Sequence, residues 1–360
     1  MKDHLVSIQV LRAFAALAVV AFHLSVSWRE DFGLTSQPQP ALLAGAYGVD
    51  VFFVISGFIM SYTTAQAHQR SPGRFMFKRL ARIVPLYWTM TLAIFVFATL
   101  APHAFHAVTS STAELLKSLF FFPYERTDGE VKPILFVGWT LNYEMFFYAV
   151  FAVSLLISRR FYLVITIAAI AGLSALGPFV HGGILASFYT NGLMLEFVWG
   201  CLLFLAFDRW PKTLAALSPI WIVGVVLVLA QNNFEPGRLR PFEVGLPAVM
   251  IVGGIVGGSM RDGPLRRTFA RIGDASYSLY LGHPYVIKIA TGRRRGAAAQ
   301  HTRGIGELCA ARAPLQPLAT PQIFQRKSTR ASRARSAGLI GASACREILP
   351  AILDDVCRGD

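Results

Sequence analysis

Charged residues are scarce in this sequence: they account for 15% of its 360 residues, whereas hydrophobic residues account for 54%. A soluble protein needs more polar surface than this, so the composition predicts a multi-spanning membrane protein. Cysteine is scarce as well, and three of the four cysteines follow residue 300. Their positions offer neither a metal-binding spacing nor a disulfide framework, so no metal site is expected.

The net charge of +14 would suggest a nucleic-acid partner if the protein were soluble. In a membrane protein the simpler explanation is that Lys and Arg accumulate in cytoplasmic loops, so we expect a lipid bilayer as partner and no nucleic acid. A basic run from Arg70 to Arg82 follows the second apolar stretch, which predicts a cytoplasmic N-terminus and a topology that alternates from there. Arg238 and Arg240 then fall on the outer side, as a mild exception to the charge bias.

The apolar stretches are candidates for membrane-spanning helices. The first, residues 5–27, is long enough to cross a hydrocarbon core roughly 30 Å thick, and it has no small-residue cleavage site of the kind that ends a signal peptide. A short interfacial helix is expected over residues 112–123. The predicted fold is an all-α, polytopic membrane helical bundle with about nine spans, at residues 5–27, 46–65, 82–101, 134–157, 161–180, 191–207, 214–230, 242–260 and 273–290.

The composition changes abruptly after residue 290. Residues 291–360 contain a single aromatic residue, Phe324, are rich in Arg, Ala, Ser, Gly and Pro, and include no apolar run of span length. Such a segment has too little apolar surface to build a core. We therefore predict a transmembrane domain over residues 1–290 and a basic, disordered tail over residues 291–360. An out-of-frame reading of a GC-rich gene and a genuine disordered tail are both compatible with this composition.

Two strongly polar residues, Arg12 and His23, lie inside the first predicted span. At about 100° per residue they project from one helix face and lie roughly 16 Å apart along the axis. A charge inside a membrane helix costs on the order of 2.5–3.5 kcal/mol unless it faces a partner or a cavity. Arg12 could instead snorkel to the cytoplasmic surface, with His23 as a packing residue. Their common face favours the functional interpretation.

Asp50 lies near the outer end of the second predicted span, in the segment GVDVFFVISGF. As a helix N-terminal acid it would be stabilised by the helix dipole. Alternatively it lies within reach of His23, whose level in the membrane it shares. A carboxylate beside an imidazole orients the ring, fixes its tautomer and raises its basicity.

Lys78, Arg79 and Arg82 lie at the inner end of the third predicted span. Positive-inside anchoring explains them, but Arg79 and Arg82 are also spaced to share a helix face and could bind an anion together. Glu144 lies near mid-membrane in the segment WTLNYEMFFY. A carboxylate at that depth rarely serves only to fill space, so we expect Glu144 to form an ion pair or to have a function. Glu196 is a weaker case of the same kind.

Further polar and aromatic candidates lie in two segments. The last predicted span contains SYSLYLGHP, with Ser276, Tyr280 and His283. Ser and Tyr commonly join membrane helices by hydrogen bonds, so a structural role is favoured for this group. Trp139 and Tyr143 in WTLNYEMFFY are candidate substrate-binding or structural residues.

Together these segments resemble the membrane-bound acyltransferase family three, whose members O-acetylate bacterial surface polysaccharides, O-antigens and nodulation factors. The resemblance covers residues 5–288 and rests on the spacing from Arg12 to His23 and on four segments in family order: GVDVFFVISGF, KRLARIVPLYW, WTLNYEMFFY and SYSLYLGHP. Within the family the chain is most similar to exopolysaccharide O-acetyltransferases. Members typically have ten spans, one more than predicted here.

The resemblance implies an enzyme of the bacterial inner membrane that transfers an acyl group, expected to be acetyl, from cytoplasmic acyl-CoA to a glycan hydroxyl. Acetyl-CoA or another acyl-CoA would be the co-substrate, with its phosphates on Arg79 and Arg82. Polysaccharide-assembly proteins are candidate partners.

Roles for the remaining residues follow from the same resemblance. His23 would deprotonate the acceptor hydroxyl or carry the acyl group, and Asp50 would orient His23. Arg12 would help to hold the cofactor or a buried acid, and Glu144 would pair with a cation or hold the acceptor.

Two alternatives stay open at this point. A polysaccharide transporter or flippase would also carry intramembrane charges, although the two halves of the chain lack the internal similarity of many transporters. A truncated, inactive enzyme is the other alternative.

Overall fold

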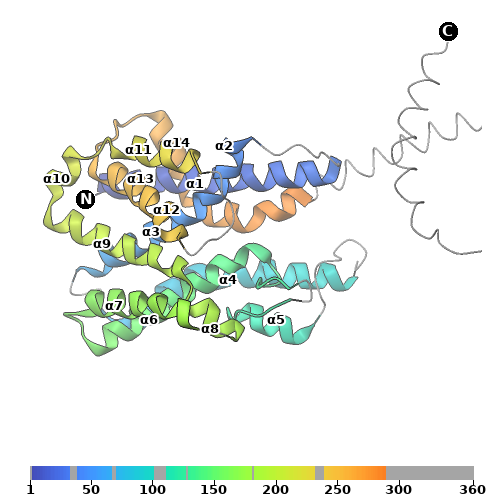
Figure 1. Cartoon of the computed structure of the whole chain (residues 1–360). Coiled ribbons are helices and arrows are strands. Elements are labelled where there is room, and N and C mark those ends of the chain that lie inside the picture. The colour runs from blue at the N-terminus through green and yellow to red at the C-terminus, as the bar shows by residue number, and fades with distance from the viewer. Residues whose placement is uncertain are drawn as a thin grey trace, which may run out of the picture. The chain divides into compact units, whose positions relative to one another are not determined.

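The computed structural model describes residues 2–32, 39–66, 70–100, 111–126, 129–180, 182–231 and 239–288. Within these ranges the regular elements are helices, and the two extended residues Glu125 and Val131 form only an isolated bridge (Figure 1). The predicted all-α class is therefore confirmed. The predicted tail, residues 291–360, lies outside the described residues.

The helices differ widely in length. Short 3₁₀ turns are η1 (Ala44–Tyr47), η4 (Phe136–Gly138), η5 (Gly177–Phe179) and η6 (Gly192–Met194). The α-helices are α1 (Lys2–Phe32), α2 (Pro40–Leu43), α3 (Gly48–Thr64), α4 (Pro72–Leu100), α5 (Thr112–Leu119), α6 (Trp139–Ile157), α7 (Tyr162–Leu176), α8 (Ile184–Tyr189), α9 (Leu195–Arg209), α10 (Pro211–Ala216), α11 (Ile220–Leu229), α12 (Arg240–Glu243), α13 (Gly245–Gly257) and α14 (Pro264–Asp274). A further helix over residues 276–288 follows α14, and we call it the last described helix.

Seven helical segments among the described residues are long and apolar enough to cross a membrane, so the predicted count of nine spans is not confirmed. The predicted span at 214–230 is interrupted, because α10 ends at Ala216 and α11 begins at Ile220. Pro219 lies at this break, and a proline has no backbone N–H to continue a helix. The resulting α11 has 10 residues, too few to cross a bilayer core.

Helix α4 begins at Pro72, earlier than the predicted span at 82–101. Proline is well tolerated in the first turn of a helix, where its missing N–H would have no intrahelical partner. The earlier start matters because it places Arg79 and Arg82 inside a regular helix rather than at its end.

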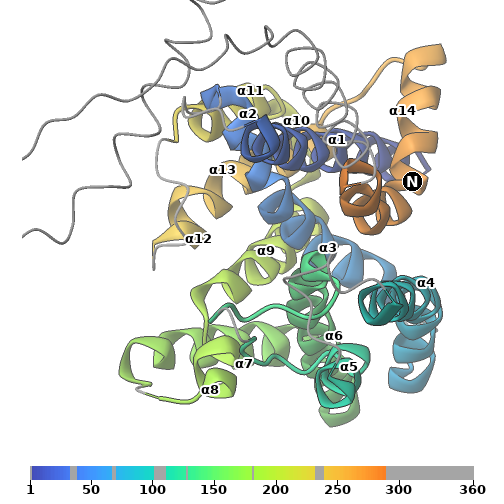
Figure 2. The ribbon, with the colours of Figure 1, turned by 90° about the vertical axis from the view of Figure 1, so that its right-hand side faces the viewer.

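Helix α3 is the central element of the described bundle. It contacts α1, α6, α9 and α13, and Figure 2 shows it between α1 on one side and α6 and α9 on the other. The predicted short helix over residues 112–123 is present as α5, which begins after Ser111.

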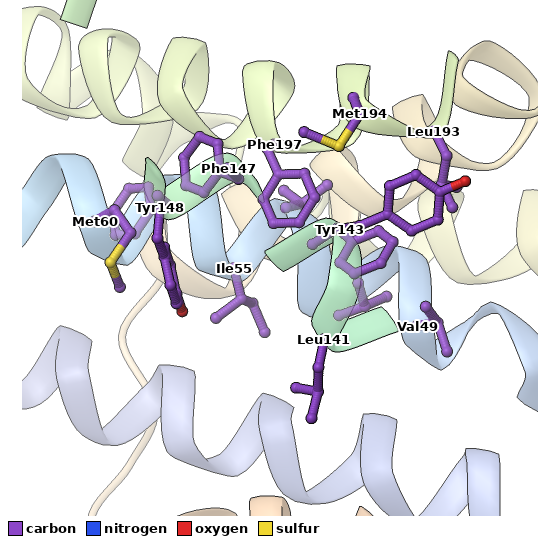
Figure 3. Close-up of a cluster of buried hydrophobic side chains, with 14 of the residues drawn as sticks. Val49, Ile55, Met60, Leu141, Tyr143, Phe147, Tyr148, Leu193, Met194 and Phe197 are labelled. Carbon is purple, nitrogen blue, oxygen red and sulfur yellow. The ribbon is translucent and has the colours of Figure 1, made fainter. Parts of the chain in front are cut away.

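Aromatic rings fill the space between α3, α6 and α9. Phe197 stacks on Phe147 (Figure 3) and on Phe53, in both cases with ring centroids 4.6 Å apart. Tyr143 stacks on Phe188 at 3.9 Å, and Trp139 meets Tyr143 edge to face at 6.0 Å. Trp139 and Tyr143 thus belong to this core, which agrees with the structural alternative for both.

Helices α3 and α9 cross in backbone contact. A Cβ atom on Gly57 would lie 2.1 Å from the carbonyl oxygen of Phe197, and one on Gly200 would lie 2.1 Å from that of Val54. Small residues at such crossings let membrane helices approach closely. The crossing brings Asp50 and Ser56 of α3 into fixed positions relative to α6 and α9.

This close contact predicts that Gly57→Ala destabilises the protein by about 1–3 kcal/mol, because the added methyl group forces two backbones apart. Gly172→Ala in α7 is the matched control, since nothing lies within 4 Å of the added atom. Thermal unfolding of the detergent-solubilised variants should show a lowered Tm for Gly57→Ala alone. Equal Tm values for the two variants would contradict the crossing.

Candidate active site

A cavity lies between α1, α3, α4, α6 and the last described helix. It brings together six of the residues predicted from the sequence, together with other polar side chains from the same helices. Its polar lining consists of Arg12, Ser56, Arg79, Arg82, Thr140, Glu144, Tyr148, Ser276, Tyr277 and Tyr280. Its volume of about 100 Å³ is enough for several water molecules or a small polar group.

Glu144 is fixed by two hydroxyl groups. Ser56 donates a hydrogen bond of 3.0 Å to its Oε1 atom, and the hydroxyl of Tyr148 donates to the same oxygen. Tyr148 lies one helical turn after Glu144 on α6, whereas Ser56 reaches it from α3. Both bonds engage a single carboxylate oxygen, so the other one remains available to a cation or a ligand.

The cavity is dominated by positive charge. Arg12, Arg79 and Arg82 line it, and Glu144 is the one acid among the described lining residues. The buried Nε atoms of Arg12 and Arg79 have no hydrogen-bond partner in the described part of the chain. The guanidinium group of Arg79 also lies over the ring of Phe75, 5.6 Å from its centroid. Donor groups buried without acceptors are costly, which makes this end of the cavity suited to an anion.

Tyrosines attach the last described helix to its neighbours. Tyr277 donates a hydrogen bond of 2.7 Å to the carbonyl of Ile83. Tyr285 donates one of 2.5 Å to that of Met90. These bonds join the helix to α4 and agree with the structural role favoured for this segment.

Tyr280 both forms hydrogen bonds with neighbouring residues and lines the cavity. It donates to the carbonyl of Val137 at 3.2 Å and lies 3.1 Å from the Thr140 hydroxyl, while its side chain also lines the cavity. Ser276 lines the cavity as well, and its buried hydroxyl has no partner in the described residues.

His23 is not among the cavity-lining residues, although it lies on the side of α1 that faces the last described helix. Its Nδ1 atom lies 3.0 Å from the carbonyl oxygen of Val19. Its ring is 4.9 Å from that of His283, centroid to centroid, and 5.5 Å from that of Phe136. Both ends of the predicted common face of Arg12 and His23 thus meet the last described helix. Arg12 lines the cavity together with Ser276 of that helix, and His23 lies against its His283.

The expected contact between Asp50 and His23 is a wrong prediction, because both carboxylate oxygens of Asp50 bind Arg240. The Nε and Nη2 atoms of Arg240 donate to Oδ1 and Oδ2 at 2.9 and 2.8 Å. Asp50 is fully buried, and a buried carboxylate is stable only beside a cation or strong donors. Glu196 is also fully buried and interacts electrostatically with both members of the pair.

Arg240 is therefore the residue that sequence reasoning missed. The available signal was its position, because it is an arginine on the predicted outer side of a chain whose basic residues otherwise follow the positive-inside rule. A charge that departs from this rule at the end of an apolar segment requires a partner.

The described bundle thus belongs to the class of polytopic helical membrane proteins, with an arginine-rich cavity as its candidate site. Comparison with known proteins identifies the family. The family model described as "Acyltransferase domain" (acyltransferase 3) matches residues 5–302. The chain belongs to this acyltransferase family and is a membrane-embedded enzyme.

Two similar proteins have names that refer to exopolysaccharide production and to O-acetyl transfer. The exopolysaccharide production protein ExoZ of Rhizobium meliloti is 34% identical over 314 residues, which cover 83% of this chain and 95% of ExoZ. The peptidoglycan O-acetyltransferase OatA of Listeria monocytogenes is 27% identical over 101 residues, covering 27% of this chain and 14% of OatA. No solved structure matches the chain. An enzyme is thereby favoured over the transporter considered from the sequence.

The ion pair predicts a coupled response to mutation. Asp50→Leu or Arg240→Met alone should each destabilise the protein by about 3–5 kcal/mol, because one buried charge then lacks its partner. The double variant should lose much less than the sum of the two. Thermal unfolding in detergent measures the coupling.

The matched control is the exposed pair of Asp262 and Arg267, whose side chains are 56% and 69% exposed. Asp262→Asn should leave the Tm close to that of the wild type, because exposed ion pairs contribute little to stability. Additive losses for Asp50→Leu and Arg240→Met would contradict the buried pair.

Proposed function

We propose that this protein is an O-acyltransferase that moves an acyl group, expected to be acetyl, from cytoplasmic acyl-CoA to a hydroxyl of a cell-surface or exopolysaccharide glycan. The family match supports acyl transfer, and the similarity to ExoZ over 95% of that relative supports an exopolysaccharide acceptor. The proposed location is the bacterial inner membrane, with a cytoplasmic N-terminus.

The observation that carries the proposal is the excess of arginine over acid in the cavity. Three guanidinium groups line one cavity with a single carboxylate among its described residues, and the buried Nε atoms of two of them have no partner there. Guanidinium groups bind phosphate through paired, charge-assisted hydrogen bonds. A phosphate-rich donor such as coenzyme A would supply acceptor atoms to Arg79, whose buried Nε atom has none among the described residues, and to Arg82 beside it in the cavity.

His23 is the proposed base for the acceptor hydroxyl. A sugar hydroxyl is a weak nucleophile at neutral pH and needs a base within hydrogen-bond reach. The Nδ1 atom of His23 lies against a backbone carbonyl, which can only accept a hydrogen bond, so Nδ1 carries a proton. In the neutral ring Nε2 then has the free lone pair. Direct transfer and a transient acyl-histidine both use this atom.

The overall step balances without further reactants. The acceptor O–H bond and the thioester C–S bond break, a C–O ester bond forms, and the acceptor proton ends on the departing thiolate. Glu144, held by Ser56 and Tyr148, is placed to pair with an arginine of the cavity or to hold a hydroxyl of the bound substrate.

His23→Ala is expected to reduce acyl transfer to a glycan acceptor by at least about 10²-fold, because the base is lost. Membrane insertion, abundance and Tm should remain close to those of the wild type. The measurement is the formation of acetylated glycan in proteoliposomes. Wild-type transfer rates in this variant would refute the role of His23.

Arg79→Lys and Arg82→Lys are each expected to weaken binding of acyl-CoA, because lysine keeps the charge but loses the two-pronged donor geometry. Arg74→Lys, an exposed position earlier in α4 that does not line the cavity, is the matched control. Equilibrium binding of acyl-CoA to the purified protein compares the three variants. If all three bind like the wild type, Arg79 and Arg82 serve only as topological anchors.

A further inference from the structure

Two histidines that are far apart in the sequence meet at one end of the face shared by α1 and the last described helix. The rings of His23 and His283 have centroids 4.9 Å apart and an interplanar angle of 46°. His283 is 3% exposed, and neither of its ring nitrogens makes a well-formed hydrogen bond with the described part of the chain. Buried polar groups are nearly always hydrogen-bonded, so this exception needs an explanation.

The proposed reaction supplies one. When His23 takes the acceptor proton, its Nδ1 atom is already engaged by the carbonyl of Val19, so the new proton sits on Nε2. That proton must reach the thiolate sulfur, which leaves from the same acyl carbon that the acceptor oxygen attacks. His23 does not line the cavity, so a group between His23 and the cavity is placed to give the proton to the sulfur of a donor that enters from there.

His283 lies between His23 and the cavity. Its ring is 5.8 Å from that of Tyr280, centroid to centroid, and Tyr280 lines the cavity. The order of groups is therefore His23, His283, Tyr280 and the cavity. No hydrogen bond joins the two imidazoles in the described part of the chain, and their centroid separation of 4.9 Å allows a proton to pass through one intervening water molecule.

We propose that His283 is a second proton-carrying residue of the site, which receives the acceptor proton from His23 and gives it to the departing thiolate. The proposal rests on the acyltransferase function proposed above. The bond changes balance: the N–H bond at His23 Nε2 breaks as one forms on His283, and the proton leaves His283 to form the S–H bond of the released thiol. Neutral His283 can accept it because it is occupied by no other well-formed hydrogen bond.

The surroundings of the pair favour a single shared proton. Groups that face it are the rings of Phe22 and Phe136 around His23, and Tyr280 beside His283. Lys132 contributes positive charge at His23. No carboxylate is in hydrogen-bond contact with either histidine among the described residues. Two imidazolium ions at this separation would repel each other strongly, so a proton on one ring leaves the other neutral and ready to receive it.

The test uses the purified full chain in proteoliposomes, with acetyl-CoA as donor and the glycan on which the wild type is active. His283→Gln keeps hydrogen-bonding atoms but cannot carry a proton at neutral pH. We expect kcat to fall by about 10²-fold or more, with an unchanged KM for acetyl-CoA and an increased solvent deuterium isotope effect. In His283→Ala, added imidazole should restore part of the lost rate.

His4→Gln is the matched control. His4 is also a helical histidine whose Nδ1 atom bonds a backbone carbonyl, that of Val256 at 2.9 Å, and it does not line the cavity. The kcat and the solvent isotope effect of the His4→Gln variant should equal those of the wild type.

Wild-type kcat in His283→Gln would overturn the relay. So would a loss of rate without imidazole rescue and with an unchanged isotope effect, which would indicate a packing role. If the wild type transfers no acyl group to any glycan, the proposed function fails and the relay fails with it. If the wild type transfers acyl groups and His283→Gln does so at the same rate, only the relay is refuted.

Discussion

A charge buried in a membrane must find a partner, and the described bundle is arranged around the few charges it buries. The cost of an unpaired charge is on the order of 2.5–3.5 kcal/mol on insertion scales, comparable to a substantial share of a protein's net stability. Asp50 meets this constraint through the two hydrogen bonds from Arg240. Arg12 and Arg79 meet it only in part, because their buried Nε atoms lack partners. The first arrangement stabilises the fold, whereas the second is suited to a ligand.

The same constraint explains why much of the site could be predicted from the sequence. Arg12, Arg79, Arg82 and Glu144 stood out because polar residues are rare within apolar stretches, and the structure brings all four to one cavity. The partner of Asp50 could not be predicted in this way. Pairing depends on tertiary contacts, and Arg240 lies 190 residues further along the chain. The level of a residue in the membrane restricts its possible partners but does not select one.

The fold shows a similar division. Hydrophobicity predicted the all-α class and most of the long helices, because a bilayer requires every backbone group to be satisfied within the helix. The number of spans was predicted less well. A hydropathy average does not register the break at Pro219, which separates α10 from α11. Nor does it show that α4 continues back to Pro72, through a stretch whose basic residues lower the average.

The central claim is that the arginine-rich cavity receives the phosphorylated part of the acyl donor, with the acyl group directed towards the two histidines. An experimental structure with a non-hydrolysable acetyl-CoA analogue tests it most directly. The account predicts phosphate groups within hydrogen-bond distance of Arg79 and Arg82, and the acyl carbonyl on the side of Tyr280 that faces His283. Density for the analogue elsewhere in the protein, with the cavity closed to it or filled by the glycan, would contradict the account.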